Sequence, residues 1–148
     1  MSGYLLADTL AQFEDVLTAS GLDLKVMDRI GPIISHTPNS LLSRGVLVRC
    51  DSTTNLNEYR DDALARVRDT ITVEGCYLIV AGKQKKCRAE AMLLEEQIRV
   101  LLTTQAPQLA SHTTYVGTTQ RGIHPLDASW WFYSMTFTTS RDAALGGA

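Results

Sequence analysis

Three histidines and three cysteines are the residues of this 148-residue chain with the clearest capacity for chemistry. His36, His112 and His124 have no histidine partner at helical i, i+4 spacing and no cysteine at metal-ligand spacing. Cys76 and Cys87 are separated by a basic turn, and their spacing is unlike that of a zinc knuckle. The pattern therefore predicts no metal site, and nothing in it calls for a cofactor.

The cysteines are expected to be reduced. An odd number at wide spacing argues against a disulfide framework. Cys50 and Cys76 fall in segments that read as strands, so we expect them to pack as small hydrophobic residues.

Catalytic signatures are missing from the sequence. There is no G-x-S-x-G nucleophile elbow, and a Cys50–histidine pair has no local motif to support it. The turn from Gly82 to Lys86 has one glycine and lacks G-x-x-x-x-G-K-[ST], so it predicts a solvated basic turn that could touch DNA or an acidic partner. We therefore expect a protein that is not an enzyme. A small enzyme or ligand-binding domain using Cys50, His124 or this turn is the alternative.

Composition predicts one globular domain over residues 1–148. Apolar residues make up 45% and charged residues 20% of the chain. The net charge of -2 and a pI near 5.9 do not predict a nucleic-acid-binding field. No apolar run approaches the ~20 residues that cross a bilayer, and the first residues lack the basic region of a signal peptide. We therefore expect no membrane partner and, by default, the cytosol.

Hydrophobic periodicity predicts an α+β fold with a mostly antiparallel, or mixed, sheet and two helices on one face. Residues 51–62 are polar and turn-rich, and they predict an exposed loop or the tip of a protruding β-hairpin or arm. Residues 22–44 are the least readable, and GLDLKV fits either a short strand or an extended connection. The predicted elements are helices over residues 3–19 and 88–104 and strands over residues 45–52, 64–81, 113–119 and 129–140.

Several residues within these elements carry specific expectations. Alternation slips near Gly75, which predicts a β-bulge there, and residues 65–74 are charged enough to predict a strand that projects toward a neighbouring subunit. Glu95 and Arg99 are spaced for an exposed ion pair on the second helix. The tail, residues 141–148, is expected to be frayed.

The last strand places four large side chains on one face, which is the predicted core side: Trp131, Tyr133, Met135 and Phe137. Trp130 and Phe132 alternate with them and are expected to be partly exposed. Large exposed aromatic residues often mark contact surfaces, so both are candidates for a subunit or partner interface.

Five arginines cluster around the strands that flank the polar loop: Arg44, Arg49, Arg60, Arg66 and Arg68. One interpretation is ordinary surface pairing with the nearby aspartates, and the other is contact with another subunit, because interfaces favour arginine. Arg60, Arg66 and Arg68 are therefore further interface candidates, and Asn55 and Tyr59 join them because they lie on the same predicted arm.

The order of these segments resembles that of the tail terminator (tail-completion) proteins of long-tailed bacteriophages. The likeness covers residues 3–141 and rests on a helix, GVLVRC, a polar loop, ARVRDTITVEGCYLIVAGK, the helix RAEAMLLEEQIRVLL and finally SWWFYSMTFTTS. Residues 22–42 carry no match to the pattern. The resemblance lies in pattern and order rather than in an invariant motif.

The resemblance implies a structural virion protein of the tail and neck, assembled in the host cytoplasm. Such proteins form a hexameric ring that caps the tail tube, stops its polymerisation and presents a surface to the head connector. The implied partners are other copies of the chain, the tail tube protein, the head connector or neck protein and, as a further option, the sheath protein. DNA would pass through the ring lumen without sequence-specific binding. Another head–tail connector component is the alternative within the same class.

Overall fold

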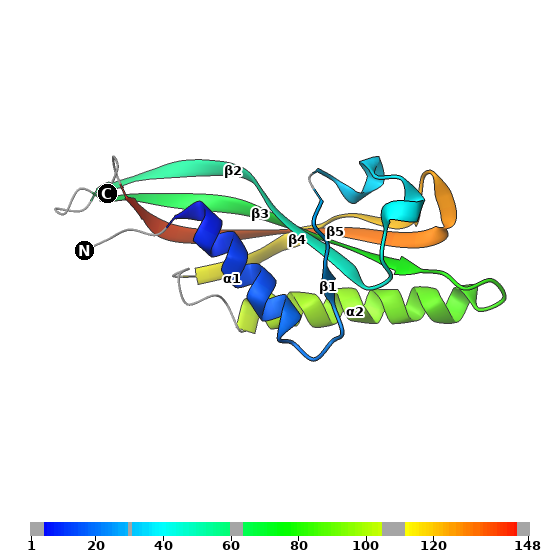
Figure 1. The fold of residues 1–148 in the computed structure, drawn as a ribbon. Helices are drawn as coiled ribbons and strands as arrows, with labels where there is room; N and C mark the ends of the chain where they lie inside the picture. Colours follow the sequence, from blue (N-terminus) through cyan, green and yellow to red (C-terminus); the bar gives the residue numbers. More distant parts are fainter. Residues whose placement is uncertain (1–4, 30, 60–63, 105–111, 145–148) are drawn as a thin grey trace.

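The computed structural model describes residues 5–29, 31–59, 64–104 and 112–144. Its elements are α1 (Leu6–Thr18), β1 (Lys25–Val26), β2 (Gly45–Tyr59), β3 (Leu64–Leu78), α2 (Gln84–Thr104), β4 (His112–His124) and β5 (Asp127–Ala144). The strand order is β1-β2-β3-β5-β4; β1 runs parallel to β2, and the other pairs are antiparallel. Both helices lie on one side of the sheet (Figure 1). The predicted α+β class, with its mostly antiparallel sheet, is therefore confirmed.

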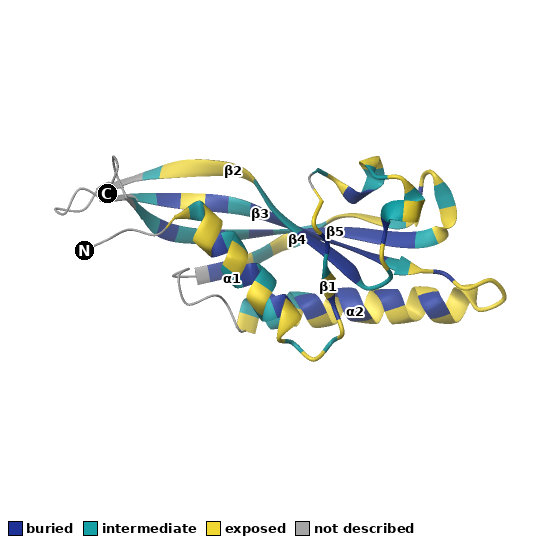
Figure 2. Ribbon diagram, in the orientation of Figure 1, coloured by how far each residue is buried: buried dark blue, intermediate teal, exposed yellow. Residues whose placement is uncertain are grey.

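The main core lies between the helices and one face of the sheet. Alternate residues of β3 and β5 point to this side because successive strand side chains face opposite ways. The predicted core set of the last strand is buried here and packs with buried residues of α1 and α2 (Figure 2). Its members include Phe13, Leu94, Ile98, Ile71, Val73, Trp131, Tyr133, Met135 and Phe137.

A second, smaller core covers part of the opposite face. The connector between β1 and β2 (described over residues 27–29 and 31–44) folds over the sheet with two short 3-10 helices, Ile33–Ser35 and Pro38–Ser40. Met27 and Ile33 of the connector pack with Phe132, which is only 7% exposed. The expectation that Phe132 is partly exposed is therefore wrong, because a distant segment of the chain covers its side of the strand.

Gly75 forms no bulge. It pairs in continuous register with Val46 of β2 and Tyr133 of β5. A Cβ atom at Gly75 would lie 2.2 Å from both Cζ and Oη of Tyr133. The glycine is therefore required by the tyrosine ring that crosses it, not by a change in the course of the strand.

Two other expectations also fail for reasons of packing. Glu95 is buried and accepts hydrogen bonds from Arg121 Nε at 3.0 Å and from Thr118 Oγ1 at 2.8 Å, instead of forming an exposed pair with Arg99. β5 runs through Ala144, and Arg141 is buried, so the first residues of the expected frayed tail form part of the sheet. The second helix also begins at Gln84, one turn earlier than the periodicity predicts.

The sheet continues beyond α2 as an arm, which we define as residues 51–59 of β2, 64–71 of β3 and 137–144 of β5 (Figure 1). At the base of the arm, Phe13 of α1 packs with Ile71 and Phe137. Register shifts follow Cys50 and Asn55 in β2, which are typical of bulges that bend a strand. The predicted hairpin of β2 and β3 is thus present, and β5 pairs with β3 along the whole arm.

Candidate assembly surface

Short hydroxyl side chains occupy the face of the sheet opposite the helices. They alternate with core residues, so the chain places them on four neighbouring strands at once. In the register of the sheet, Thr70 of β3 lies beside both Ser52 of β2 and Thr138 of β5, and Thr138 lies beside Thr114 of β4. We call the following set the hydroxyl face: Ser52, Thr54, Thr70, Thr72, Thr114, Thr136, Thr138 and Ser140.

Part of the hydroxyl face is open to solvent, whereas Thr72 is buried. Ser52, Thr54 and Thr114 are exposed, Thr70 and Thr138 are half-buried, and no described element lies over this part of the sheet (Figure 1). Each hydroxyl can both donate and accept a hydrogen bond. Short side chains also lose little conformational entropy when they become ordered. The face can therefore bind another polar surface without a deep pocket.

Charged side chains border this face on the arm. Arg66 Nη1 lies 3.2 Å from Asp142 Oδ1, so these two half-buried residues join β3 to β5. Arg68 is exposed and, with Thr114, Thr138 and neighbouring residues, lines a shallow depression of about 170 Å³. Because Arg68 is exposed, its guanidinium group can contact a partner protein at this face.

The opposite side of the arm holds a buried ion pair. Arg141 Nε donates to Asp69 Oδ2 at 2.6 Å, and Asp69 is fully buried. Thr53 Oγ1 donates to the other carboxylate oxygen of Asp69 at 2.6 Å. These contacts join β2, β3 and β5, which makes the arm a fixed three-stranded unit rather than a loose hairpin.

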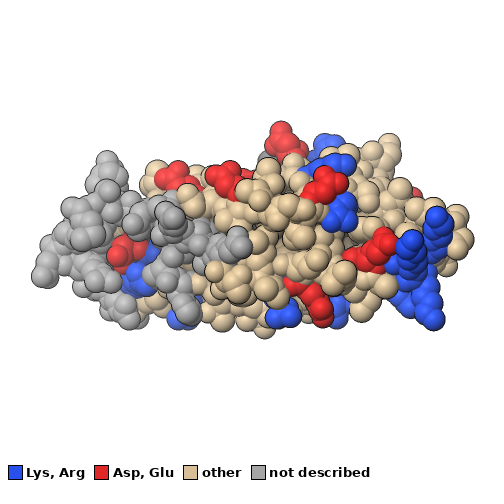
Figure 3. All heavy atoms as spheres, turned by 90° about the horizontal axis from the view of Figure 1, so that it is seen from below, with Lys and Arg blue, Asp and Glu red and all other residues tan. Residues whose placement is uncertain are grey.

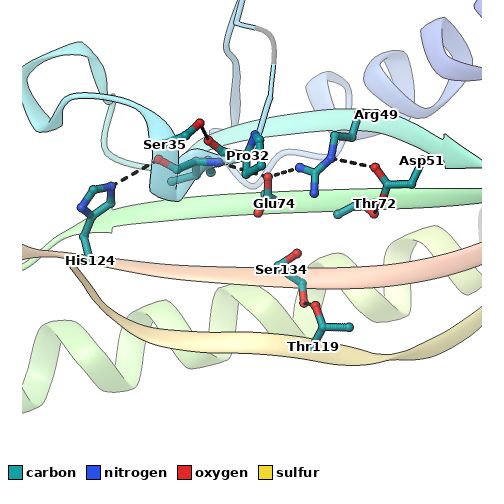
Figure 4. Close-up of polar contacts among 10 residues, drawn as sticks. Pro32, Ser35, Arg49, Asp51, Thr72, Glu74, Thr119, His124 and Ser134 are labelled. Atoms are coloured by element: carbon teal, nitrogen blue, oxygen red, sulfur yellow. Dashed lines mark hydrogen bonds and ion pairs between the residues drawn. The ribbon is translucent and has the colours of Figure 1, made fainter. Parts of the chain in front are cut away.

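A polar chain connects the hydroxyl face to the connector (Figure 4). Glu74 is buried, and it accepts hydrogen bonds from the backbone N–H of Ile33 at 3.2 Å and from Arg49. Arg49 also pairs with Asp51, which accepts a hydrogen bond from Thr72. Burial opposes the charge on Arg49, but the attraction and hydrogen bonds of Glu74 and Asp51 together outweigh it, and the pKa of Arg49 is raised. The connector is thereby held in place at the border of the hydroxyl face.

The predicted interface residues fall at different places. Arg66 and Arg68 share the hydroxyl face, as their spacing implies. Asn55 is exposed, but its register opposite Val67 puts it on the helix side of the arm. Tyr59 ends β2, although its side chain lies outside the described residues, as does the whole of Arg60.

The two aromatic candidates lie away from the arm, beside the connector. Phe132 belongs to the second core, and Trp130 is half-buried against the same cluster. The structure therefore removes Phe132 from the set of surface residues and leaves Trp130 partly accessible.

The histidine and cysteine candidates have structural surroundings. His124 is buried; its Nε2 lies 3.2 Å from the carbonyl oxygen of Ile33, and its Nδ1 accepts the N–H of Leu126 at 3.1 Å. Burial raises the pKa of Cys50, and it raises the pKa of Cys76 to about 12. Among the described residues, no group of three or more His, Cys, Asp or Glu side chains is placed to hold a metal ion.

Asp69, Arg141 and Glu74 are the site residues that sequence reasoning missed. Asp69 alternates with Ile71 and Val73 on one face of β3, and this position was a usable signal that its carboxylate is buried. A buried carboxylate requires a partner, but the sequence does not reveal that the partner is Arg141, which lies 72 residues away.

No described helix has the length and apolar character needed to span a bilayer. A comparison with known protein families and with curated proteins finds no match to this chain.

Proposed function

We propose that this protein is a structural component of a bacteriophage tail that acts as a tail terminator. In this role, copies of the chain form a ring, hexameric by resemblance, that caps the tail tube, stops its growth and offers a surface to the head connector. The observation that carries the proposal is the arm with its open hydroxyl face: a long, rigid, polar sheet surface suited to protein contact.

Two features of the arm support this role. Its ion pairs, Arg141 with Asp69 and Arg66 with Asp142, join β3 to β5, and the hydrogen bond from Thr53 to Asp69 adds β2, so the arm needs little ordering when it meets a partner. The depression beside Arg68 holds only about 170 Å³, which is smaller than the pockets that bind small molecules. A flat polar surface of this kind fits the tube protein or a neighbouring copy better than a small ligand.

Electron microscopy of particles assembled without this protein tests the proposal. Overlong tails are expected, because nothing then stops tube polymerisation. Tailless heads beside tails of normal length would instead identify a head–tail connector protein. Light scattering of the purified chain, alone and with tail tubes, supplies the second test: a monomer that also fails to bind tubes contradicts the proposal.

A further inference from the structure

A pocket of about 440 Å³ lies between the start of α2 and the strands that flank the β4–β5 turn, at the end of the molecule opposite the arm (Figure 1). Pockets that bind small molecules typically hold about 300–1,000 Å³. The volume here falls within that range, whereas the depression beside Arg68 holds only about 170 Å³. This end of the molecule therefore has room for a ligand and is not only a flat contact surface.

The sheet supplies an apolar wall to the pocket. Trp131 of β5, Ile123 of β4 and Ile79, which follows β3, line this side. Ile123 lies directly opposite Trp131 in the strand register, so their side chains share one face of the sheet. Ile123 is 49% exposed, and an apolar group bound in the pocket would remove part of its surface from water.

The start of α2 supplies a cationic wall. Lys85 and Arg88 line the pocket and are three residues apart, so they lie on the same face of the helix. Both are exposed, and neither forms an ion pair with another described residue. None of the described residues that line the pocket is acidic, and Asp127, which begins β5, accepts the backbone N–H of Ser129 at 2.8 Å. Figure 3 shows Lys and Arg side chains gathered at this end of the molecule.

Trp131 brings an unused hydrogen-bond donor to the same place. The residue is 9% exposed, and its Nε1 is buried with no hydrogen-bond partner among the described residues. Buried polar groups nearly always have a partner, so an unpartnered donor in a residue that lines a pocket points to an acceptor that binds there. The pocket also adjoins the N-terminal end of α2, where the helix dipole favours negative charge. These features favour an anionic ligand with acceptor atoms.

We propose that this pocket binds a small ligand in which one carboxylate is joined to a flat apolar group. The carboxylate lies against Lys85 and Arg88, because a guanidinium group can donate two parallel hydrogen bonds to a carboxylate. The apolar group packs against Trp131 and Ile123, since aromatic side chains bury flat apolar groups well. A single negative charge suits a pocket whose other wall is apolar, because a more highly charged group would lose more hydration there. The site is separate from the hydroxyl face, so this inference does not depend on the proposed tail-terminator role.

Tryptophan fluorescence of the full chain tests the proposal. The chain has two tryptophans, so Trp130→Phe leaves Trp131 as the only one. Phenylpropionate is the probe, and its binding is expected to change the emission of Trp131 in a saturable manner. The neutral analogue phenylpropionamide should bind at least about tenfold more weakly, because it cannot form the charge-assisted hydrogen bonds. An emission that does not respond to the acid, or equal binding of the acid and the amide, contradicts the proposal.

Two matched pairs of substitutions, each made in the Trp130→Phe chain, locate the site. Lys85→Gln with Arg88→Gln removes the cationic wall and should weaken binding of phenylpropionate at least about tenfold. Lys83→Gln with Lys86→Gln removes the same charge from exposed lysines that line a different depression, and should weaken binding by less than about twofold, since solvent ions screen distant surface charges. All four residues are exposed, so both variants are expected to fold. Equal losses of affinity in the two variants would assign the binding to the general positive charge of this end and would overturn the proposed pocket.

Discussion

Arg141 and Asp69 form a buried ion pair that ties the last strand to the central strand of the sheet, with Nε and Oδ2 2.6 Å apart. Both residues point to the helix side of the arm, where the side chain of Arg141 is 8% exposed and that of Asp69 is inaccessible to solvent. A pair in this position orders the C-terminal residues that the sequence suggested were frayed.

Removal of Arg141 alone is expected to destabilise the protein strongly. Arg141→Met leaves the Asp69 carboxylate buried without its charge partner, which typically costs about 3–5 kcal/mol. Urea denaturation measures the change in the free energy of unfolding. Arg68→Met is the matched control: Arg68 is exposed one residue from Asp69, so a loss beyond about 0.5 kcal/mol there would contradict this assignment.

Gly75 and Tyr133 are expected to depend on one another. Gly75→Ala places a methyl group against the fully buried tyrosine ring, and overpacking of this kind costs about 1–3 kcal/mol. In a Tyr133→Leu background the same Gly75→Ala substitution should cost less, since the ring tip is gone. A double-mutant cycle by urea denaturation measures the difference, and equal costs in both backgrounds would refute the contact.

Cys76 is expected to make the protein less stable at alkaline pH. In the unfolded chain the Cys76 thiol has a pKa of about 8.5, whereas in the folded protein burial raises this pKa to about 12. Between these values the folded state keeps a proton that the unfolded state has lost, so stability falls as pH rises. From pH 8.5, where half of the unfolded thiols are already ionised, to pH 10 this amounts to about 1.6 kcal/mol, since the full slope of about 1.4 kcal/mol per pH unit is reached only above the unfolded pKa.

Urea denaturation at pH 8.5 and at pH 10 checks this expectation. Cys76→Ala removes the titrating group, and its free energy of unfolding should fall less over the same interval. An identical fall in Cys76→Ala and wild type would assign the alkaline sensitivity to other groups.

Local periodicity was sufficient to predict much of this fold. Alternation assigned Tyr133 and Phe137 to the core, and the spacing of Leu94 and Ile98 identified the buried stripe of α2, because each pattern depends only on neighbours within the same element. The class of the fold followed from the order of these elements.

The missed features depend on contacts between distant parts of the chain. Phe132 is buried because a connector that begins about a hundred residues earlier folds over it, and residues 22–44 had no readable period. Glu95 is spaced for a local pair with Arg99, but Arg121 on β4 binds it instead. The hydroxyl face also needs the strand register, since its rows join residues from four strands.

Phe132 and Trp130 are expected to respond differently to truncation. Phe132→Ala removes a ring that is 7% exposed beneath the connector, which should cost about 3–5 kcal/mol. Trp130→Ala should cost less, because Trp130 is only half-buried against the same cluster. Thermal or urea denaturation measures both, and a Phe132→Ala protein as stable as Trp130→Ala would contradict the covering role of the connector.

Arg68 is expected to matter for assembly but not for folding. It is exposed on the hydroxyl face beside Thr138 and Ser140, so Arg68→Glu should change the free energy of unfolding by no more than about 0.5 kcal/mol. A reversed charge at the border of the hydroxyl face should nevertheless repel the partner that meets the arginine. Complementation of particles that lack the protein provides the measurement, with overlong tails expected for Arg68→Glu.

Arg29→Glu reverses an exposed arginine in the connector, away from the arm, and should restore normal tails. Normal tails from Arg68→Glu would exclude this part of the hydroxyl face from the assembly contact.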